Sequence, residues 1–367
     1  MGILIFGHFK SWMTLCLMRS RIDNPSLPDR EAWIDVLRVI SCFAVILIHT
    51  SGQTYHQFSS IPNAEWWFAN VLNGSCRCAV PLFVMISGAT LKQSDVDATG
   101  FYRKKAFRFL PVILIWSVLY ACFDWIVLGM GFGEILAMFL GRGFTYQHLW
   151  YLSMYLIMLM FVPFLARIRF SPNADDSQWR ILLIVGFLIV SVDWGFDVVC
   201  RALEVTFVPW PRTFVEFIPY LLFGLLFADR RNLSFLRRPE IWLIIFLVAS
   251  LGANWLAVSR LGLVEDTMPL ANRSPLVAAV AVGVFLLVRE QSWGARFSKL
   301  MRAMSPACLG IYLIHPFFLW LIQRVLRGNG IDVLRGGWMP VTAALLFLIS
   351  LLTVSMIRRI PYGKKIC

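Results

Sequence analysis

Apolar residues fill most of the chain in blocks of about 20, and charged residues gather in short runs between the blocks. A helix of about 20 apolar residues spans the roughly 30 Å hydrocarbon core of a bilayer. The pattern therefore predicts an all-α integral membrane protein with a bundle of about ten transmembrane helices. We expect these helices at residues 33–52, 66–91, 107–129, 147–167, 180–198, 212–228, 239–259, 272–288, 304–324 and 338–357.

The positive charges predict the orientation of these helices. Cytoplasmic loops of membrane proteins accumulate Lys and Arg. With the N-terminus inside, the loops on that side carry about three times as many Lys and Arg residues as the outer loops. We therefore expect an even number of spans, with the N- and C-termini both in the cytoplasm.

The first thirty residues differ from the rest of the chain. They hold an apolar stretch that His8 and Lys10 interrupt, and further basic residues follow this stretch. A cleavable signal peptide has the opposite order, with its basic residues first. We interpret residues 1–30 as a mobile or interfacial N-terminal extension, with a wrongly assigned start codon as the alternative. Residues 31–367 are expected to form a single membrane domain.

The composition agrees with a membrane location and argues against two other kinds of protein. Hydrophobic residues make up 59% of the chain, against roughly 45–50% in soluble domains. The net charge of +13 is compatible with nucleic-acid binding, but the basic residues border apolar spans and form no continuous polar domain. The eight Cys residues show no metal-binding spacing. We therefore expect membrane lipids as neighbours, and neither nucleic acid nor a metal.

The first span carries three ionisable residues in an otherwise apolar stretch. On a helix, Arg38 and His49 lie about 16 Å apart and within about 20° of one face, so we expect them to border the same groove. Asp35 is three positions before Arg38, close enough to pair with it. Two interpretations remain open: Asp35 and Arg38 anchor the helix at the interface and His49 bonds a neighbouring helix, or all three residues serve catalysis.

Other spans add further polar candidates. Arg77 lies well inside the second apolar block, where a charge requires a partner or a watery cavity. The start of the third span carries Lys105 and Arg108, which either set the topology or face a ligand. His148 and His315 fall at the start of the fourth span and within the ninth. Either histidine taken alone is more often structural than catalytic.

Four motifs in order give the chain a resemblance to acyltransferase family 3, the membrane-bound O-acyltransferases of bacterial surface polysaccharides. The motifs are "IDVLRVISCFAVILIHT", "NVLNGSCRCAVPLFVMISG", "HLWYL" and "LGIYLIHP". The sequence most resembles the branch that O-acetylates enterobacterial common antigen. It departs from the family at the third span, where Lys105 and Arg108 stand for a double Arg, and after Ser87-Gly88, where Ala89 and Thr90 replace an aromatic residue.

The resemblance implies an acyl-CoA donor, usually acetyl-CoA as co-substrate, and a glycan or lipid-linked glycan as acceptor, in the bacterial inner membrane. His49 is then the candidate general base, because a neutral imidazole can take the proton of a sugar hydroxyl as the oxygen attacks a thioester. Arg38 would assist it together with Asp35. The donor phosphates would bind Arg38, Lys105 and Arg108.

The resemblance assigns the remaining candidates to the acceptor or to the oxyanion. Arg77 and Ser87 would orient the acceptor or stabilise the oxyanion, and His148 and His315 would line the acceptor path. Direct transfer and a ping-pong route through an acyl-histidine both fit these residues. The motifs leave open which glycan hydroxyl is modified, whether a longer acyl group replaces acetyl, and on which membrane side the transfer takes place.

Two other functions compete with an acyltransferase. A transporter or flippase for a glycan lipid would use intramembrane Arg and His residues to bind an anionic head group, but transporters often show paired halves with interrupted spans. The sequence contains no such pairing. A structural scaffold would leave Arg38, His49, Arg77 and His315 without a role.

Overall fold

The computed structural model describes residues 32–92, 95, 97–135, 148–169, 217–228, 238–262, 268–272, 274–327 and 332–367, and single residues between 184 and 195. Within these residues every regular element is a helix, as the apolar blocks predict. The expected N-terminal extension, residues 1–30, lies outside the described part, and so does most of the expected span at 180–198.

Six helical segments are long and apolar enough to cross a membrane. They are Ala32–Tyr55, Asn63–Ala89, Ala98–Val127, Pro239–Arg260, Ala295–Leu326 and Trp338–Ile357. A seventh results if the bent pair Trp150–Leu159 and Val162–Ile168, with 42° between its halves, forms one span. Six of the expected spans are therefore confirmed as helices of sufficient length and apolar character. The total of about ten is not confirmed within the described residues.

Two further helices at expected spans have fewer than 18 residues. Helix α11 (Ile218–Phe227) has 10 residues and α13 (Pro275–Glu290) has 16. At 1.5 Å per residue, α13 covers about 24 Å, less than the hydrocarbon thickness. Its start is defined locally, since the side chain of Ser274 accepts a hydrogen bond from the amide of Leu276 and Pro275 occupies the first helical position.

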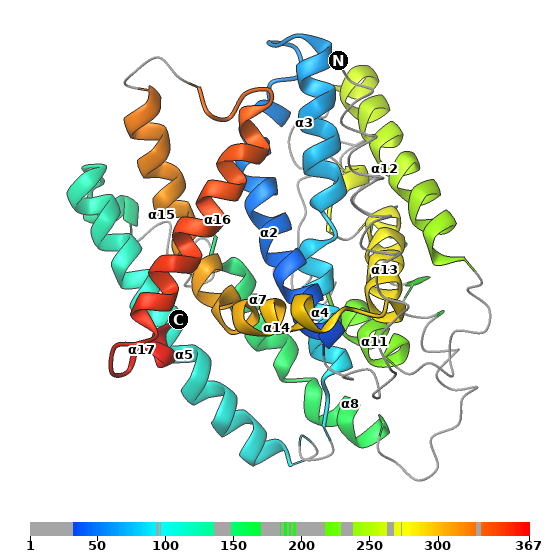
Figure 1. Ribbon diagram of the computed structural model, residues 1–367, viewed down its shortest axis with the longest axis vertical. Helices are drawn as coiled ribbons and strands as arrows, with labels where there is room; N and C mark the ends of the chain where they lie inside the picture. The colour runs from blue at the N-terminus through cyan, green and yellow to red at the C-terminus, as the bar shows by residue number, and fades with distance from the viewer. Residues whose placement is uncertain are drawn as a thin grey trace.

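Helix α2 (Ala32–Tyr55) is the centre of the bundle. It packs against six helices. These are α3 (Asn63–Cys76), α4 (Ala79–Ala89), α13, α14 (Ala295–Met304), α15 (Cys308–Arg327) and α16 (Trp338–Ile357). In Figure 1, α2 (blue) runs through the middle, with α15 and α16 on its left and α3 and α12 (Pro239–Leu261) on its right.

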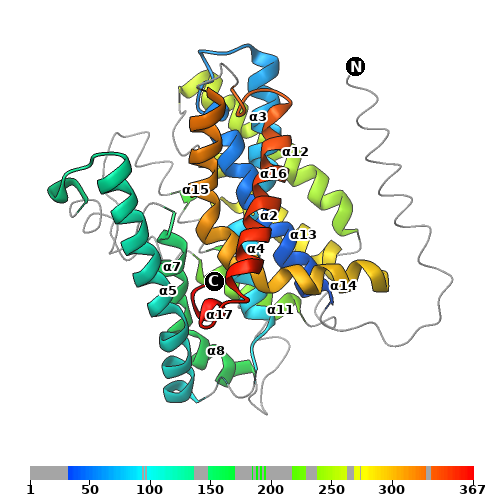
Figure 2. The ribbon, with the colours of Figure 1, turned by 60° about the vertical axis from the view of Figure 1, so that its left-hand side comes forward.

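Helix α14 lies across the direction of the long helices in both Figure 1 and Figure 2. Arg296 and Lys299 on this helix are exposed, whereas Ser298 and Met301 are buried against the bundle. Trp293, just before the helix, stacks on Phe297 with ring centroids 5.1 Å apart. A polar face with basic residues and an apolar face that packs inward are typical of a helix lying in a membrane interface.

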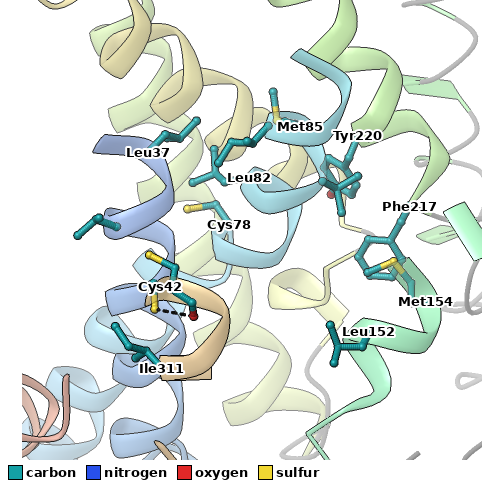
Figure 3. Close-up of a cluster of buried hydrophobic side chains, with 14 of the residues drawn as sticks. Leu37, Cys42, Cys78, Leu82, Met85, Leu152, Met154, Phe217, Tyr220 and Ile311 are labelled. Atoms are coloured by element: carbon teal, nitrogen blue, oxygen red, sulfur yellow. Dashed lines mark hydrogen bonds between the residues drawn. The ribbon is translucent and has the colours of Figure 1, made fainter. Parts of the chain in front are cut away.

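The main hydrophobic core joins α2, α4, α7 (Trp150–Leu159), α11 and α15. Figure 3 shows part of it around Cys42, whose thiol donates to the carbonyl of Cys308 over 3.6 Å. Leu37, Leu82 and Met85 lie close by, and each is at most 1% exposed. Because side chains of α2 and α4 interlock here, the position of α2 depends on apolar packing as well as on its polar partners.

Helices α4 and α11 approach each other at two glycines. A Cβ built on Gly88 would overlap the carbonyl of Leu221, and one built on Gly224 would overlap the carbonyl of Met85. Small residues at such crossings let two backbones come close within a membrane. Gly88 belongs to the Ser-Gly pair that ends the second motif, so the pair has a packing role in this fold.

We expect Gly88→Ala to destabilise the protein. The added methyl group must separate α4 from α11, and overpacking of this kind costs about 1–3 kcal/mol. Gly252→Ala in α12 is the matched control, because a Cβ there meets no atom within 4 Å. That control should be neutral or slightly stabilising. Thermal unfolding of both purified variants in detergent measures the difference, and equal midpoints would contradict the close crossing.

Candidate active site

A cavity of about 500 Å³ lies between α2 and the start of α5 (Ala98–Val127). Its lining is rich in charge, with five basic and three acidic residues. The lining residues are Ile34, Asp35, Arg38, Thr90, Lys92, Asp95, Asp97, Gly100, Phe101, Lys104, Lys105 and Arg108. We call this space the basic cavity.

Helix α5 begins nine residues earlier than the apolar block predicts, at Ala98. Asp97 caps it, because its carboxylate accepts a hydrogen bond from the amide of Gly100 over 3.2 Å. The early start places Lys105 and Arg108 on a helix rather than in a loop. Three positions apart on that helix, they share a face and both reach the basic cavity.

The cations of the basic cavity are held loosely. Arg38 lies 3.5 Å from Asp35, and its side chain is 37% exposed, which confirms the expected pair. Lys105 lies over the ring of Phe101 at 5.2 Å, and Arg108 lies over the ring of Phe109 at 5.5 Å. An exposed ion pair contributes little to stability. These cations therefore remain available to an anionic ligand.

A second group of residues lies farther along α2. The ring of His49 contacts that of His315 in α15, with centroids 5.0 Å apart, and His148 lies 6.4 Å from His315. His315 is fully buried and His148 is 8% exposed, whereas His49 is accessible. We call these three residues the imidazole cluster. Its members come from three segments that are distant in the sequence.

Two tyrosines support the imidazole cluster. Tyr120 in α5 donates its hydroxyl to the carbonyl of Leu313 over 2.7 Å and contacts the ring of His148 edge-on at 4.5 Å. Tyr312 in α15 donates its hydroxyl to the carbonyl of His148. These bonds tie α5, α15 and the start of α7 together around the three imidazoles.

Arg77 lies at a break in the second span. Helix α3 ends at Cys76 and α4 begins at Ala79, so Arg77 falls between them. Its Nε donates to Oδ1 of Asn73 over 2.7 Å, and its guanidinium lies 5.7 Å from the centroid of the Tyr55 ring. The side chain is within electrostatic range of His49.

Asn73 is fully buried and joins Arg77 to α2. Its Nδ2 donates to the carbonyl of Ile48 and to the hydroxyl of Ser51, each over 3.1 Å. Both acceptors are within two residues of His49. Asn73 therefore fixes Arg77 relative to the helical turn that carries His49.

A row of tyrosine rings connects the basic cavity with the imidazole cluster. Tyr155 lies within electrostatic range of Arg38 and Arg108. It stacks on Tyr151 with centroids 5.9 Å apart, and Tyr151 contacts Tyr312 at 5.7 Å. Tyr312 lies beside His148 and His315.

These three tyrosines were not among the site residues that the sequence predicted. Tyr151 and Tyr155 stand four positions apart, which places them on one face of a helix, and Tyr312 lies inside the "LGIYLIHP" motif. The helical spacing of the first pair was a usable signal. Their contact with Tyr312 was not visible without the tertiary structure.

A protein-family model for an acyltransferase domain, that of acyltransferase family 3, matches residues 31–358. The match covers most of the chain and includes the basic cavity and the imidazole cluster. The chain belongs to this acyltransferase family. Comparison of this chain with the curated proteins and with the solved structures gives no match.

Arg38 and His49, which we expected to border one groove, belong to two different groups of residues in the acyltransferase. The described residues that line the basic cavity include Arg38 but no member of the imidazole cluster. Arg38 turns toward the start of α5, and His49 turns toward α15. Ser87 lies between these sites, hydrogen-bonded to the hydroxyl of Tyr155 over 3.2 Å and to the carbonyl of Phe83 over 3.1 Å.

The structure gathers the predicted site residues into two groups. Asp35, Arg38, Lys105 and Arg108 line the basic cavity of the acyltransferase. His49, His148 and His315 form the imidazole cluster. Within the described residues no group of three or more His, Cys, Asp or Glu side chains is arranged to hold a metal ion.

We expect Arg77→Lys to destabilise the acyltransferase although it keeps the charge. Lys has no Nε–H at the required position, so the buried oxygen of Asn73 loses its donor at a cost of about 1–3 kcal/mol. Arg38→Lys is the control, because the partly exposed pair with Asp35 contributes at most about 1 kcal/mol. Chemical unfolding of both variants in detergent tests this, and equal losses would show that Asn73 does not hold Arg77.

Proposed function

We propose that this acyltransferase moves an acetyl group from acetyl-CoA to a sugar hydroxyl of a cell-surface polysaccharide or of its lipid-linked precursor. The observation that carries the proposal is the pair of sites on α2, a basic cavity around Arg38 and an imidazole cluster around His49. Membership of the acyltransferase family supports a thioester donor. The resemblance of the four motifs supports a bacterial surface glycan, with enterobacterial common antigen as the first acceptor to test.

The basic cavity suits the phosphate groups of coenzyme A. Arg38 and Arg108 present planar guanidinium groups that can bond two phosphate oxygens at once, and Lys105 adds a point charge. Asp35 and Asp95 in the same lining offset part of the mutual repulsion of these cations before the donor binds. Arg38 and His49 are eleven positions apart on α2, about 16 Å along the helix. The long flexible arm of the donor would carry the thioester over that distance.

The imidazole cluster suits the transfer step. His49 takes the proton from the sugar hydroxyl while the oxygen attacks the thioester carbonyl. The new carbon–oxygen bond forms, the carbon–sulfur bond breaks, and the thiolate of CoA leaves and takes up the proton held by His49. Arg77 lies within electrostatic range of His49 and would stabilise the negative oxygen that develops on the carbonyl.

We place the protein in the bacterial inner membrane with both termini in the cytoplasm. The excess of basic residues in alternate loops supports this orientation. The basic cavity then faces the cytoplasm, where CoA esters are made, and His49 lies in the outer half of its helix. An acceptor would approach His49, the accessible member of the imidazole cluster, from the opposite side.

We expect His49→Asn to abolish most of the transfer. Loss of a general base lowers the rate by about 10²–10⁴-fold, while the affinity for acetyl-CoA stays unchanged because residue 49 is remote from the basic cavity. Mass spectrometry checks this prediction on surface glycans from cells that lack the gene and are complemented with the wild type or with His49→Asn. Acetylated glycans are heavier by the mass of one acetyl group, and the variant should lose most of this signal. Undiminished acetylation with His49→Asn would refute the assignment of the base.

We expect Arg108→Ala to raise the KM for acetyl-CoA about tenfold or more, since a charge-assisted hydrogen bond contributes about 1.5–3 kcal/mol. The matched control is Arg296→Ala on the exposed face of α14, outside the basic cavity. The assay measures the release of CoA thiol by the full chain in proteoliposomes made with glycolipids of the producing cells. An equal KM in both variants would show that the donor binds elsewhere.

A further inference from the structure

The His-Pro pair in the middle of α15 has a local consequence for the backbone. In an α-helix the amide of each residue donates to the carbonyl four positions earlier. Pro316 has no amide proton, so the carbonyl of Tyr312 loses its normal donor. A helix carbonyl buried in a membrane bundle needs another donor.

The side chain of His315 supplies that donor. Its Nδ1 lies 2.8 Å from the carbonyl oxygen of Tyr312 and 3.2 Å from that of Ile311. Carbonyl oxygens only accept hydrogen bonds, so Nδ1 must carry the proton. In the neutral imidazole the other nitrogen, Nε2, is then a bare acceptor.

That acceptor is sealed inside the protein and has no partner in the structure. His315 is fully buried, and its Nε2 makes no hydrogen bond. Two neighbouring hydroxyls are committed elsewhere, because Tyr120 donates to the carbonyl of Leu313 and Tyr312 donates to the carbonyl of His148. The ring of His49 is in contact at 5.0 Å between centroids. A buried acceptor without a donor costs about 1–3 kcal/mol.

We propose that His315 is a positioning residue for His49. Its Nε2 accepts a hydrogen bond from a ring N–H of His49, directly or through one water molecule, which leaves the other nitrogen of His49 unprotonated and turned toward the acceptor hydroxyl. A third group that orients a catalytic base in this way is a recurrent arrangement. Catalytic hydrogen bonds are often long before substrate binds and tighten in the complex.

In this arrangement Pro316 and His315 act as a unit. The proline frees the carbonyl of Tyr312, the carbonyl fixes the proton on Nδ1 of His315, and the fixed proton leaves Nε2 as an acceptor for His49. The inference rests on the proposed function, in which His49 is the base. A purely structural His315 would need only the Nδ1 proton.

Two substitutions at residue 315 separate these roles. The amide nitrogen of Asn can replace Nδ1 and donate to the carbonyl of Tyr312, but Asn has no group at the position of Nε2. Gln reaches that position, and its oxygen can accept the bond from His49. We expect His315→Asn to fold normally and to lower kcat about 10²-fold with an unchanged KM for acetyl-CoA, as for a misplaced catalytic group. His315→Gln should recover part of that loss.

Pro316→Ala tests whether the proline confines the proton of His315 to Nδ1. It restores the amide that competes for the carbonyl of Tyr312, so the proton of His315 is no longer confined to Nδ1. We expect a lower kcat together with an equal or higher unfolding temperature, because Ala is the better helix former. An unchanged kcat in this variant would show that the proline does not control the imidazole.

The assay is CoA release by the full chain in proteoliposomes, with thermal unfolding of each variant in parallel. Wild-type kcat in His315→Asn, or an equal loss of kcat and stability in both substitutions at residue 315, would overturn the inference. His49→Asn in the same assay distinguishes the two proposals. If His49→Asn is inactive while His315→Asn is fully active, the base assignment stands and only the positioning role fails.

Discussion

The hydrocarbon core of a membrane offers no water to polar groups, so each of them must find a partner within the protein. In the part of α2 that follows His49, this requirement decides which helices lie beside it. Tyr55 bonds Asn254 of α12 over 3.0 Å, and Asn254 bonds Asn70 of α3 over 2.8 Å. The indole of Trp66 donates to the carbonyl of Tyr55 over 2.9 Å. These bonds hold α3 and α12 against the turns of α2 that follow His49.

Two irregularities in the helices likewise change the hydrogen bonding of polar groups at the candidate site. The second span is interrupted at Arg77, and α15 contains Pro316. Both positions lie close to His49, since Asn73 joins Arg77 to the turn that carries His49 and the ring of His315, next to Pro316, contacts the ring of His49. Arg77 donates to Asn73 there, and His315 lies within hydrogen-bond distance of the carbonyl of Tyr312, which Pro316 leaves without an amide donor. Local departures from regular helix therefore concentrate where the chemistry is proposed, as is common at functional sites.

The sequence predicted a large part of this structure because its signals are local. Apolar blocks of about 20 residues predict spans whatever their neighbours, and six of them are confirmed. The pair between Asp35 and Arg38 follows from a spacing of three on a helix. The start of α5 was missed because Asp97 caps a polar stretch that a hydropathy pattern does not count as helix. The span expected at 272–288 corresponds to α13, which has a similar length but begins at Pro275, because the side chain of Ser274 caps it there.

The sequence by itself determined the membrane location, the helical class and the residue types from which an acyl-transfer site can be built. The tertiary structure decided how they are grouped. Arg38 and His49 share a face of α2 on an ideal helix, yet Arg38 faces α5 and His49 faces α15, because a side chain follows the partner that packs beside it. The contacts of His315 with His49 and of Tyr151 with Tyr312 join segments more than a hundred residues apart. Such contacts depend on how whole helices pack, and helical periodicity carries no information about that.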